Sequence, residues 1–127
     1  MRSVKVGICG LGTVGSGVFN VITRNTQHIN ARAGCKIEIY QVGARRDNPN
    51  CDMLQTPIVR DIFEVAKNPQ IDIVVELIGG TTVARELVIT ALEHGKHVVT
   101  ANKALIAEHG MEIFAMATSK GLTVAYV

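Results

Sequence analysis

The sequence predicts an α/β fold built on a doubly wound parallel sheet. Strand-like apolar runs alternate with helical patterns along the whole chain, which is the order typical of such sheets. A glycine-rich turn joins the first expected strand to the first expected helix. Of the 127 residues, 47% are hydrophobic, which is enough to form one buried core. We therefore expect a single domain over residues 1–127.

The first strand is expected at Val4–Cys9, and it leads directly into the sequence GLGTVG at residues 10–15. In such a turn Gly10 allows the tight bend, Gly12 lets the backbone approach a pyrophosphate, and Gly15 lets the helix pack on the strand. The helix N-terminus then offers free N–H groups and a positive dipole end to a diphosphate. The context predicts a Rossmann-type dinucleotide-binding domain, and the alternative is an ordinary tight turn.

The first half of the chain continues with helix, strand and helix. A first helix follows the glycine turn, because apolar residues recur at helical spacing at Val14, Val18, Val21 and Ile22. A second strand is expected at 36–44, where β-branched residues prevail, and the polar residues 45–50 close it as a loop. Asp61 is the expected N-cap of a short helix that ends at Asn68-Pro69.

The second half repeats the alternation. Residues 71–78 are largely apolar, as in a strand covered on both faces of a parallel sheet. A helix is expected at 82–94, with Gly95 as its left-handed cap. A strand at 97–100 precedes a helical region that runs to residue 120 with an interruption near Gly110, and Gly121 precedes a last strand at 122–126.

Charge and hydropathy exclude several classes of protein. Thirteen Lys and Arg against eleven Asp and Glu give a formal charge of +2, with no run of like charge typical of a nucleic-acid-binding arm. The apolar stretch near the N-terminus is too short and too interrupted by glycine for a signal peptide or a membrane span. We therefore expect a cytoplasmic protein that binds neither nucleic acid nor membrane.

The cysteines and histidines predict no metal site. Three cysteines, Cys9, Cys35 and Cys51, share no metal-ligand spacing, which favours reduced thiols, and Cys9 is expected in the core. The four histidines have no carboxylate or cysteine at ligand spacing and are expected to be structural or exposed: His28, His94, His97 and His109.

All strand-end loops of a parallel sheet meet at one edge, and this edge is the expected site. The loop after the second strand decides between the cofactors, because an acidic residue binds the ribose of NAD and an arginine accommodates the 2′-phosphate of NADP. Arg45 and Arg46 stand there, further along than the usual spacing of about 20 positions, and they favour NADP. Asp47 offers NAD binding instead, and two solvated loop arginines are the other alternative.

Two further loops carry candidate cofactor contacts. Gly79-Gly80-Thr81 permits close approach beneath a nicotinamide ribose, and a plain turn capped by Thr81 or Thr82 is the alternative. Lys103 is placed to meet a phosphate or a substrate carbonyl, with Thr100 and Asn102 as hydrogen-bond partners; the alternative is a lysine that faces solvent.

Glu76 is a separate case. Its carboxylate stands within an otherwise apolar strand, where it requires a partner or a strand end, and the sequence gives no reason for it.

Three segments together resemble the amino-terminal nucleotide-binding domain of homoserine dehydrogenase. They are VGICGLGTVG at 6–15, VVELIGG at 74–80 and KHVVTANKAL at 96–105. The resemblance covers nearly the whole chain, and TANKAL is far more specific than the glycine turn.

The resemblance implies NAD(P)-dependent interconversion of L-homoserine and L-aspartate 4-semialdehyde in threonine and methionine biosynthesis. It implies that Thr13 and Val14 contact the diphosphate and nearby ribose, and that the catalytic Lys103 lies beside the nicotinamide. The family's substrate-binding acids, second catalytic lysine and dimer-forming substrate domain lie beyond this chain. The full protein is then expected to be a homodimer or homotetramer that binds homoserine or aspartate 4-semialdehyde.

The chain departs from the family at its end. Members of the family usually continue after the tyrosine with a glutamate that helps to bind a monovalent cation. In this chain Tyr126 is followed by Val127, so we predict no metal site from the resemblance. We expect a fragment that binds NADP, with NAD possible, and that does not turn over substrate alone.

Two alternatives to this function stay open. One is another small-molecule NAD(P) oxidoreductase, although the sugar oxidoreductases that share the G-K-H-V strand continue with a segment resembling E-K-P rather than ANKA. The other is a non-catalytic Rossmann module that senses nucleotides.

Overall fold

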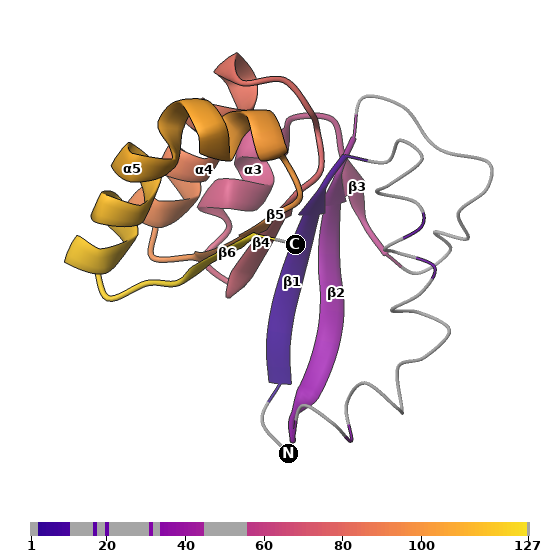
Figure 1. The fold of residues 1–127 in the computed structure, drawn as a ribbon. Helices are drawn as coiled ribbons and strands as arrows, with labels where there is room; N and C mark the ends of the chain where they lie inside the picture. Colours follow the sequence, from indigo (N-terminus) through magenta and orange to yellow (C-terminus); the bar gives the residue numbers. More distant parts are fainter. Residues whose placement is uncertain are drawn as a thin grey trace.

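The described strands form one six-stranded parallel sheet (Figure 1). The structure is a computed structural model that describes residues 3–10, 17, 20, 31, 34–44 and 56–126. The strands are β1 (Ser3–Cys9), β2 (Lys36–Gly43), β3 (Ile58–Val59), β4 (Ile73–Glu76), β5 (His97–Thr100) and β6 (Val124–Tyr126). Their order across the sheet is β3-β2-β1-β4-β5-β6, and every neighbouring pair is parallel. This is the Rossmann strand order, so the predicted fold class is confirmed.

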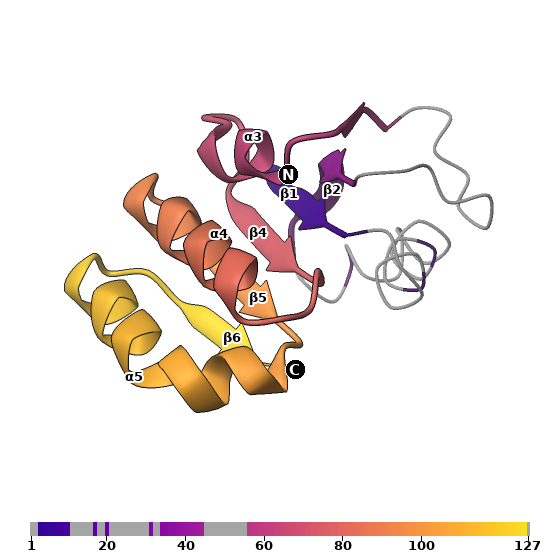
Figure 2. The same ribbon diagram turned by 90° about the horizontal axis from the view of Figure 1, so that it is seen from above.

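The described helices lie side by side on one face of this sheet (Figures 1 and 2). They are α3 (Ile62–Lys67), α4 (Thr82–Glu93) and α5 (Lys103–Ser119). The cap predicted for α3 is confirmed, because the side chain of Asp61 accepts a hydrogen bond of 2.9 Å from the Phe63 N–H. Most of the first helix that the sequence predicts, apart from Gly17 and Asn20, and the whole of the predicted loop at 45–50 lie outside the described residues.

The predicted interruption near Gly110 is wrong, because α5 continues through it. A helical glycine costs about 1 kcal/mol relative to alanine. The packing of α5 outweighs this cost, since Leu105, Ile113 and Ala117 are all buried against the core.

Apolar residues cover both faces of the sheet. Towards the helices, Val74 of β4 joins a large cluster that contains Val65 of α3, Leu87 of α4 and Ile113 of α5. Alternate positions of the strands point to the other face, where the second cluster consists of Val6, Ile8, Val42, Ala44 and Val75. The apolar run predicted for a strand covered on both faces is thus confirmed for β4, although the strand is shorter than 71–78.

Two glycines let α3 lie close to the sheet. A Cβ atom on Gly7 would stand 2.3 Å from Cγ1 of Val65, and one on Gly43 would stand 3.0 Å from Cα of Ile62. These distances are too short for any larger residue without movement of the helix. The glycines of β1 and β2 therefore fix the depth at which α3 packs.

Candidate functional site

The carboxyl ends of the strands meet at one edge of the sheet, where the strand order changes direction between β1 and β4 (Figure 2). The chain proceeds from β1 to β2 on one side and places β4 on the other, and open α/β sheets bind their ligands at such a switch point. Short backbone bonds hold the strand ends together here: the Gly10 N–H donates to the Gly43 carbonyl at 2.8 Å, and the Leu77 N–H donates to the Cys9 carbonyl at 2.9 Å.

Gly10 is the one glycine of the predicted GLGTVG turn that the structure describes. Its φ of +110° is one that residues with a side chain rarely adopt. A Cβ atom there would stand 2.8 Å from the carbonyl oxygen of Leu77. Position 10 thus requires a glycine for two reasons: the backbone there has a positive φ, and the loop that follows β4 leaves no room for a side chain. The other proposed contacts of this region and of the next loop lie outside the described residues: Gly12, Thr13, Val14, Gly15, Arg45 and Arg46.

Gly79 and Gly80 form an exposed turn after β4. Both have positive φ, +76° and +72°, and a Cβ atom on either would meet nothing within 4 Å. Thr81 occupies the N-cap position of α4, but its side chain makes no capping hydrogen bond. The capping expected of Thr81 in the plain-turn alternative is therefore absent, and open space adjoins the two glycines.

Thr100, Asn102 and Lys103 follow one another at the junction of β5 and α5. Thr100 is fully buried, and Asn102 is the N-cap of α5, with its side-chain oxygen accepting from the Leu105 N–H at 3.0 Å. Lys103 is the exposed first residue of the helix. A lysine opposes the helix dipole at this position, so helix stability does not explain its presence.

Glu76, which the sequence left unexplained, joins the β4 and β5 loops. It is fully buried at the end of β4. One of its carboxylate oxygens accepts from the Thr100 hydroxyl at 2.6 Å, and the other accepts from the Ile78 N–H at 3.0 Å. The only signal in the sequence was a carboxylate within an apolar run, and its partners become visible only when β5 lies next to β4.

Asn102 completes this connection. Its N–H donates to Oγ1 of Thr100 at 3.0 Å, and its side-chain amide donates to the carbonyl oxygen of Gly80 at 2.5 Å. The structure thus brings the predicted residues Gly80, Thr100, Asn102 and Lys103 together at one place.

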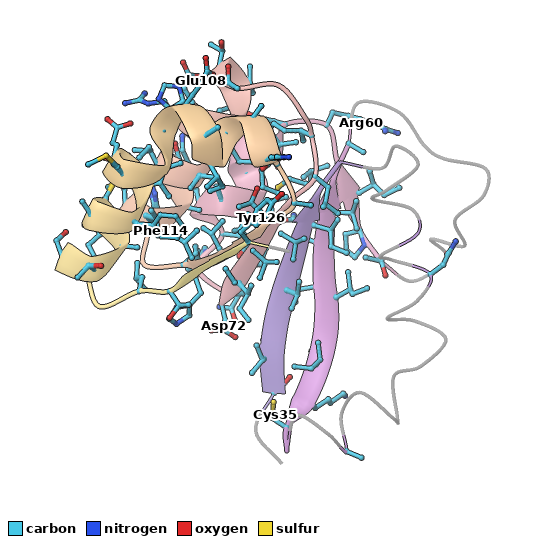
Figure 3. All side chains as sticks on the ribbon, in the orientation of Figure 1. Cys35, Arg60, Asp72, Glu108, Phe114 and Tyr126 are labelled. Carbon is cyan, nitrogen blue, oxygen red and sulfur yellow. The ribbon has the colours of Figure 1, made fainter. Side chains whose placement is uncertain are left out.

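Arg60 is a cation at this edge that the sequence analysis missed. It follows β3, a strand of two residues that has too short an apolar run to be predicted. Figure 3 shows Arg60 at the end of the sheet where the strands β1 to β3 finish. Its guanidinium donates to the carbonyl oxygen of Ala44 at 3.2 Å, and Ala44 directly precedes Arg45 in the sequence. A positive charge therefore stands at the end of β2, where Rossmann domains distinguish their cofactors.

Lys96 belongs to the KHVV segment but lies away from this edge, since it precedes β5. It is buried, and its ammonium group donates to the carbonyl oxygen of Asn68 at the C-terminal end of α3 at 2.5 Å. Burial lowers the pKa of Lys96, and the nearby Asp72 carboxylate partly opposes this shift. The lysine thus supports the fold by capping a helix.

The described part of the chain holds no group of three His, Cys, Asp or Glu residues that could bind a metal ion. Two histidines have structural bonds: a ring nitrogen of His94 lies 2.8 Å from the carbonyl oxygen of Thr90, and His97 accepts from the Thr123 N–H at 3.1 Å. Within the same residues, no helix combines the length and apolar character that a bilayer-spanning segment needs.

Cys9 is a buried core thiol, as predicted. Burial raises its pKa from 9.0 to about 12, and the Glu76 carboxylate adds to the shift. The native thiol stays protonated at pH values where the unfolded chain ionises. Stability from this group is therefore complete below about pH 8 and is lost as the pH rises from 9 towards 12.

We expect this loss to be measurable against a Cys9→Ala variant, which lacks the thiol. At pH 10 the stability lost in this way amounts to about 1 kcal/mol. The unfolding free energy of each protein is measured by urea unfolding at pH 7.5 and at pH 10. Between these pH values the unaltered chain should lose more stability than Cys9→Ala, by about this amount. A difference that is the same at both pH values would show that the native thiol ionises normally.

The strand order, its change of direction between β1 and β4 and the tight turn after β1 place the chain among Rossmann-type nucleotide-binding domains. A family model described as "Homoserine dehydrogenase, NAD binding domain" matches residues 10–127, so the chain belongs to this family.

Curated relatives and solved structures agree with this assignment. A homoserine dehydrogenase from Pseudomonas aeruginosa is 66% identical over 126 residues, which cover 99% of this chain and 29% of the relative. One from Bacillus subtilis is 34% identical over 99% of this chain and 30% of its own length. The chain thus spans about 30% of the length of these relatives.

The solved structure of a homoserine dehydrogenase from Thiobacillus denitrificans is 44% identical, with a TM-score of 0.88 over 98% of this chain and 29% of that one. One from S. aureus has a TM-score of 0.90 at 32% identity, over 99% of this chain and 33% of that one. The structure therefore represents an NAD-binding domain of the fold found in these enzymes.

Proposed function

We propose that this chain, as a domain over residues 1–127, is the part of a homoserine dehydrogenase that binds the nicotinamide nucleotide. The observation that carries the proposal is the hydrogen bond between Asn102 and Gly80, which joins the loops after β4 and β5 at the switch point. It holds the glycine turn beside the start of α5, where Lys103 stands. The family match supplies the reaction class for this arrangement.

The residues at this edge fit a dinucleotide. The turn at Gly10 leads towards the proposed diphosphate contacts: Gly12, Thr13, Val14 and Gly15. A Cβ atom on Gly79 or Gly80 would meet nothing within 4 Å, and we assign the nicotinamide ring and its ribose to this position, with Thr81 next to them. Thr100 acts from its buried position, by holding Asn102.

When bound, the nucleotide supplies hydride transfer between L-homoserine and L-aspartate 4-semialdehyde. Lys103 would stand beside the substrate oxygen, where its ammonium group stabilises developing negative charge and can donate a proton to the alcohol or receive one from it. We propose it as the catalytic residue of this domain.

The rest of the proposal concerns the full protein. The relatives extend well beyond the matched region, and we assign substrate binding and the formation of a homodimer or homotetramer to that further part. The chain by itself should therefore bind nucleotide without oxidising homoserine. We also propose a role in threonine and methionine biosynthesis and a cytoplasmic setting, which the free thiols of Cys9 and Cys35 support.

We propose NADP as the preferred cofactor, with Arg45 and Arg46 as ligands of the 2′-phosphate. The cation at Arg60 supports an anion site at the end of β2. Fluorescence titration of the chain should show NADPH binding at least about tenfold tighter than NADH, because arginine–phosphate hydrogen bonds are charge-assisted. The double variant Arg45→Ala, Arg46→Ala should lose this preference.

A control variant with Lys36→Ala and Lys120→Ala removes two exposed positive charges from other parts of the chain. It should retain the preference for NADPH. Equal affinity for the two nucleotides in the unaltered chain would contradict the NADP assignment, and saturable binding of neither would contradict the proposed function.

A further inference from the structure

The burial of the Glu76 carboxylate at the end of an apolar strand is energetically unfavourable. A carboxylate with no exposed surface loses its hydration, and hydrogen bonds within the protein restore this loss only in part. Its two bonds come from neutral donors, the Thr100 hydroxyl and the Ile78 N–H. An apolar residue in this strand would avoid the cost of burying the charge, so stability alone does not account for a glutamate.

The bonds around Glu76 form a closed ring. From Glu76 the ring passes through Thr100 to Asn102, crosses to the carbonyl of Gly80, and returns along the backbone to the Ile78 N–H. We call these five residues the loop ring. The loop ring joins the loop after β4 to the loop after β5 at two points. The Glu76 carboxylate makes the connection at the strand ends, and the Asn102 side-chain amide makes it further out along the loops.

A carboxylate gives this ring a fixed direction. An ionised glutamate only accepts hydrogen bonds, so the Thr100 hydroxyl must donate its single proton to Glu76. The Thr100 oxygen is then left as an acceptor for the Asn102 N–H. A glutamine at position 76 has one acceptor atom, its amide oxygen, and one donor atom, its amide nitrogen, in place of two acceptor oxygens. It therefore cannot accept from both the Thr100 hydroxyl and the Ile78 N–H in the way that the carboxylate does.

We propose that Glu76 is a positioning residue for the nicotinamide end of the nucleotide, an inference that rests on the proposed function above. Through the loop ring it sets the exposed Gly79–Gly80 backbone and the start of α5, where Lys103 directly follows Asn102. Glu76 itself is fully buried and acts only through these neighbours.

The test compares two ligands of the chain, NADPH and 2′-phospho-ADP-ribose, which lacks the nicotinamide. Glu76→Gln and Thr100→Val should each weaken NADPH binding by about tenfold, while binding of 2′-phospho-ADP-ribose stays within about twofold. Thr100→Ser retains the hydroxyl and should restore NADPH affinity. Thr90→Val is the matched control, since it removes a hydroxyl that bonds only within α4.

Backbone amide resonances give the second readout. Those of Ile78, Gly79 and Gly80 should shift in Glu76→Gln and in Thr100→Val, but not in Thr90→Val. Equal weakening of both ligands would show general damage to the fold and would overturn the inference, as would unchanged NADPH affinity in both ring variants. If the unaltered chain binds neither ligand, the proposed function fails and this inference fails with it.

Discussion

Replacing Lys103 with alanine is expected to lower the kcat of a full-length homoserine dehydrogenase that carries this domain by about 10²- to 10⁴-fold. The proposed role of the ammonium group is to stabilise charge and move a proton at the substrate oxygen, so its loss affects turnover. NADPH affinity should stay within about threefold, because the nucleotide has its other contacts. Steady-state kinetics of homoserine oxidation and an NADPH titration measure the two effects.

Stability provides an independent check on this interpretation of Lys103. The lysine stands at the N-terminal end of α5, where a cation opposes the helix dipole, so its removal should raise the unfolding free energy by up to about 1 kcal/mol. Lys120 is the matched control, because it is exposed at the other end of the same helix. Lys120→Ala should lower stability slightly and leave kcat unchanged. A Lys103→Ala enzyme with kcat within about threefold of normal would contradict the catalytic role.

Local signals in the sequence were sufficient for most of the architecture. The apolar run at β4, the Asp61 cap and the glycine after α4 each specify a boundary by short-range chemistry, and each lies close to its predicted place. The interruption at Gly110 failed because helix propensity is a weak term beside the packing of α5 on the core. Strand β3 has only two residues, and its pairing with β2 gives no sequence pattern.

The site could be predicted only as far as the strand ends could be located. The loops of Gly80 and Lys103 were expected at one edge because parallel strands end together. The hydrogen bonds that join them depend on the register of β4 and β5, which places Glu76 opposite Thr100. Register between strands far apart in the sequence is a tertiary property, so the hydrogen-bond partners of Glu76 could not be predicted from the sequence. The placement of Arg60 beside Ala44 has the same origin.

Replacing Gly10 with alanine is expected to have the largest effect on the fold, lowering the unfolding free energy by about 2–4 kcal/mol. A methyl group there adds the strain of a φ of +110° to a contact of 2.8 Å with the Leu77 carbonyl oxygen, which belongs to backbone and cannot rotate away. Urea unfolding measures the loss.

Gly17→Ala is the matched control for Gly10→Ala, because Gly17 is exposed and helical and a Cβ atom there would meet nothing within 4 Å. This substitution should leave stability unchanged or raise it by up to about 1 kcal/mol, since alanine favours a helix. The contrast separates a glycine that the chain needs for its backbone conformation from one that it merely tolerates. Equal stability of the two variants would show that the turn at Gly10 can change conformation to accommodate a methyl group. The close approach of the loops after β1 and β4 would then not be a fixed feature of the site.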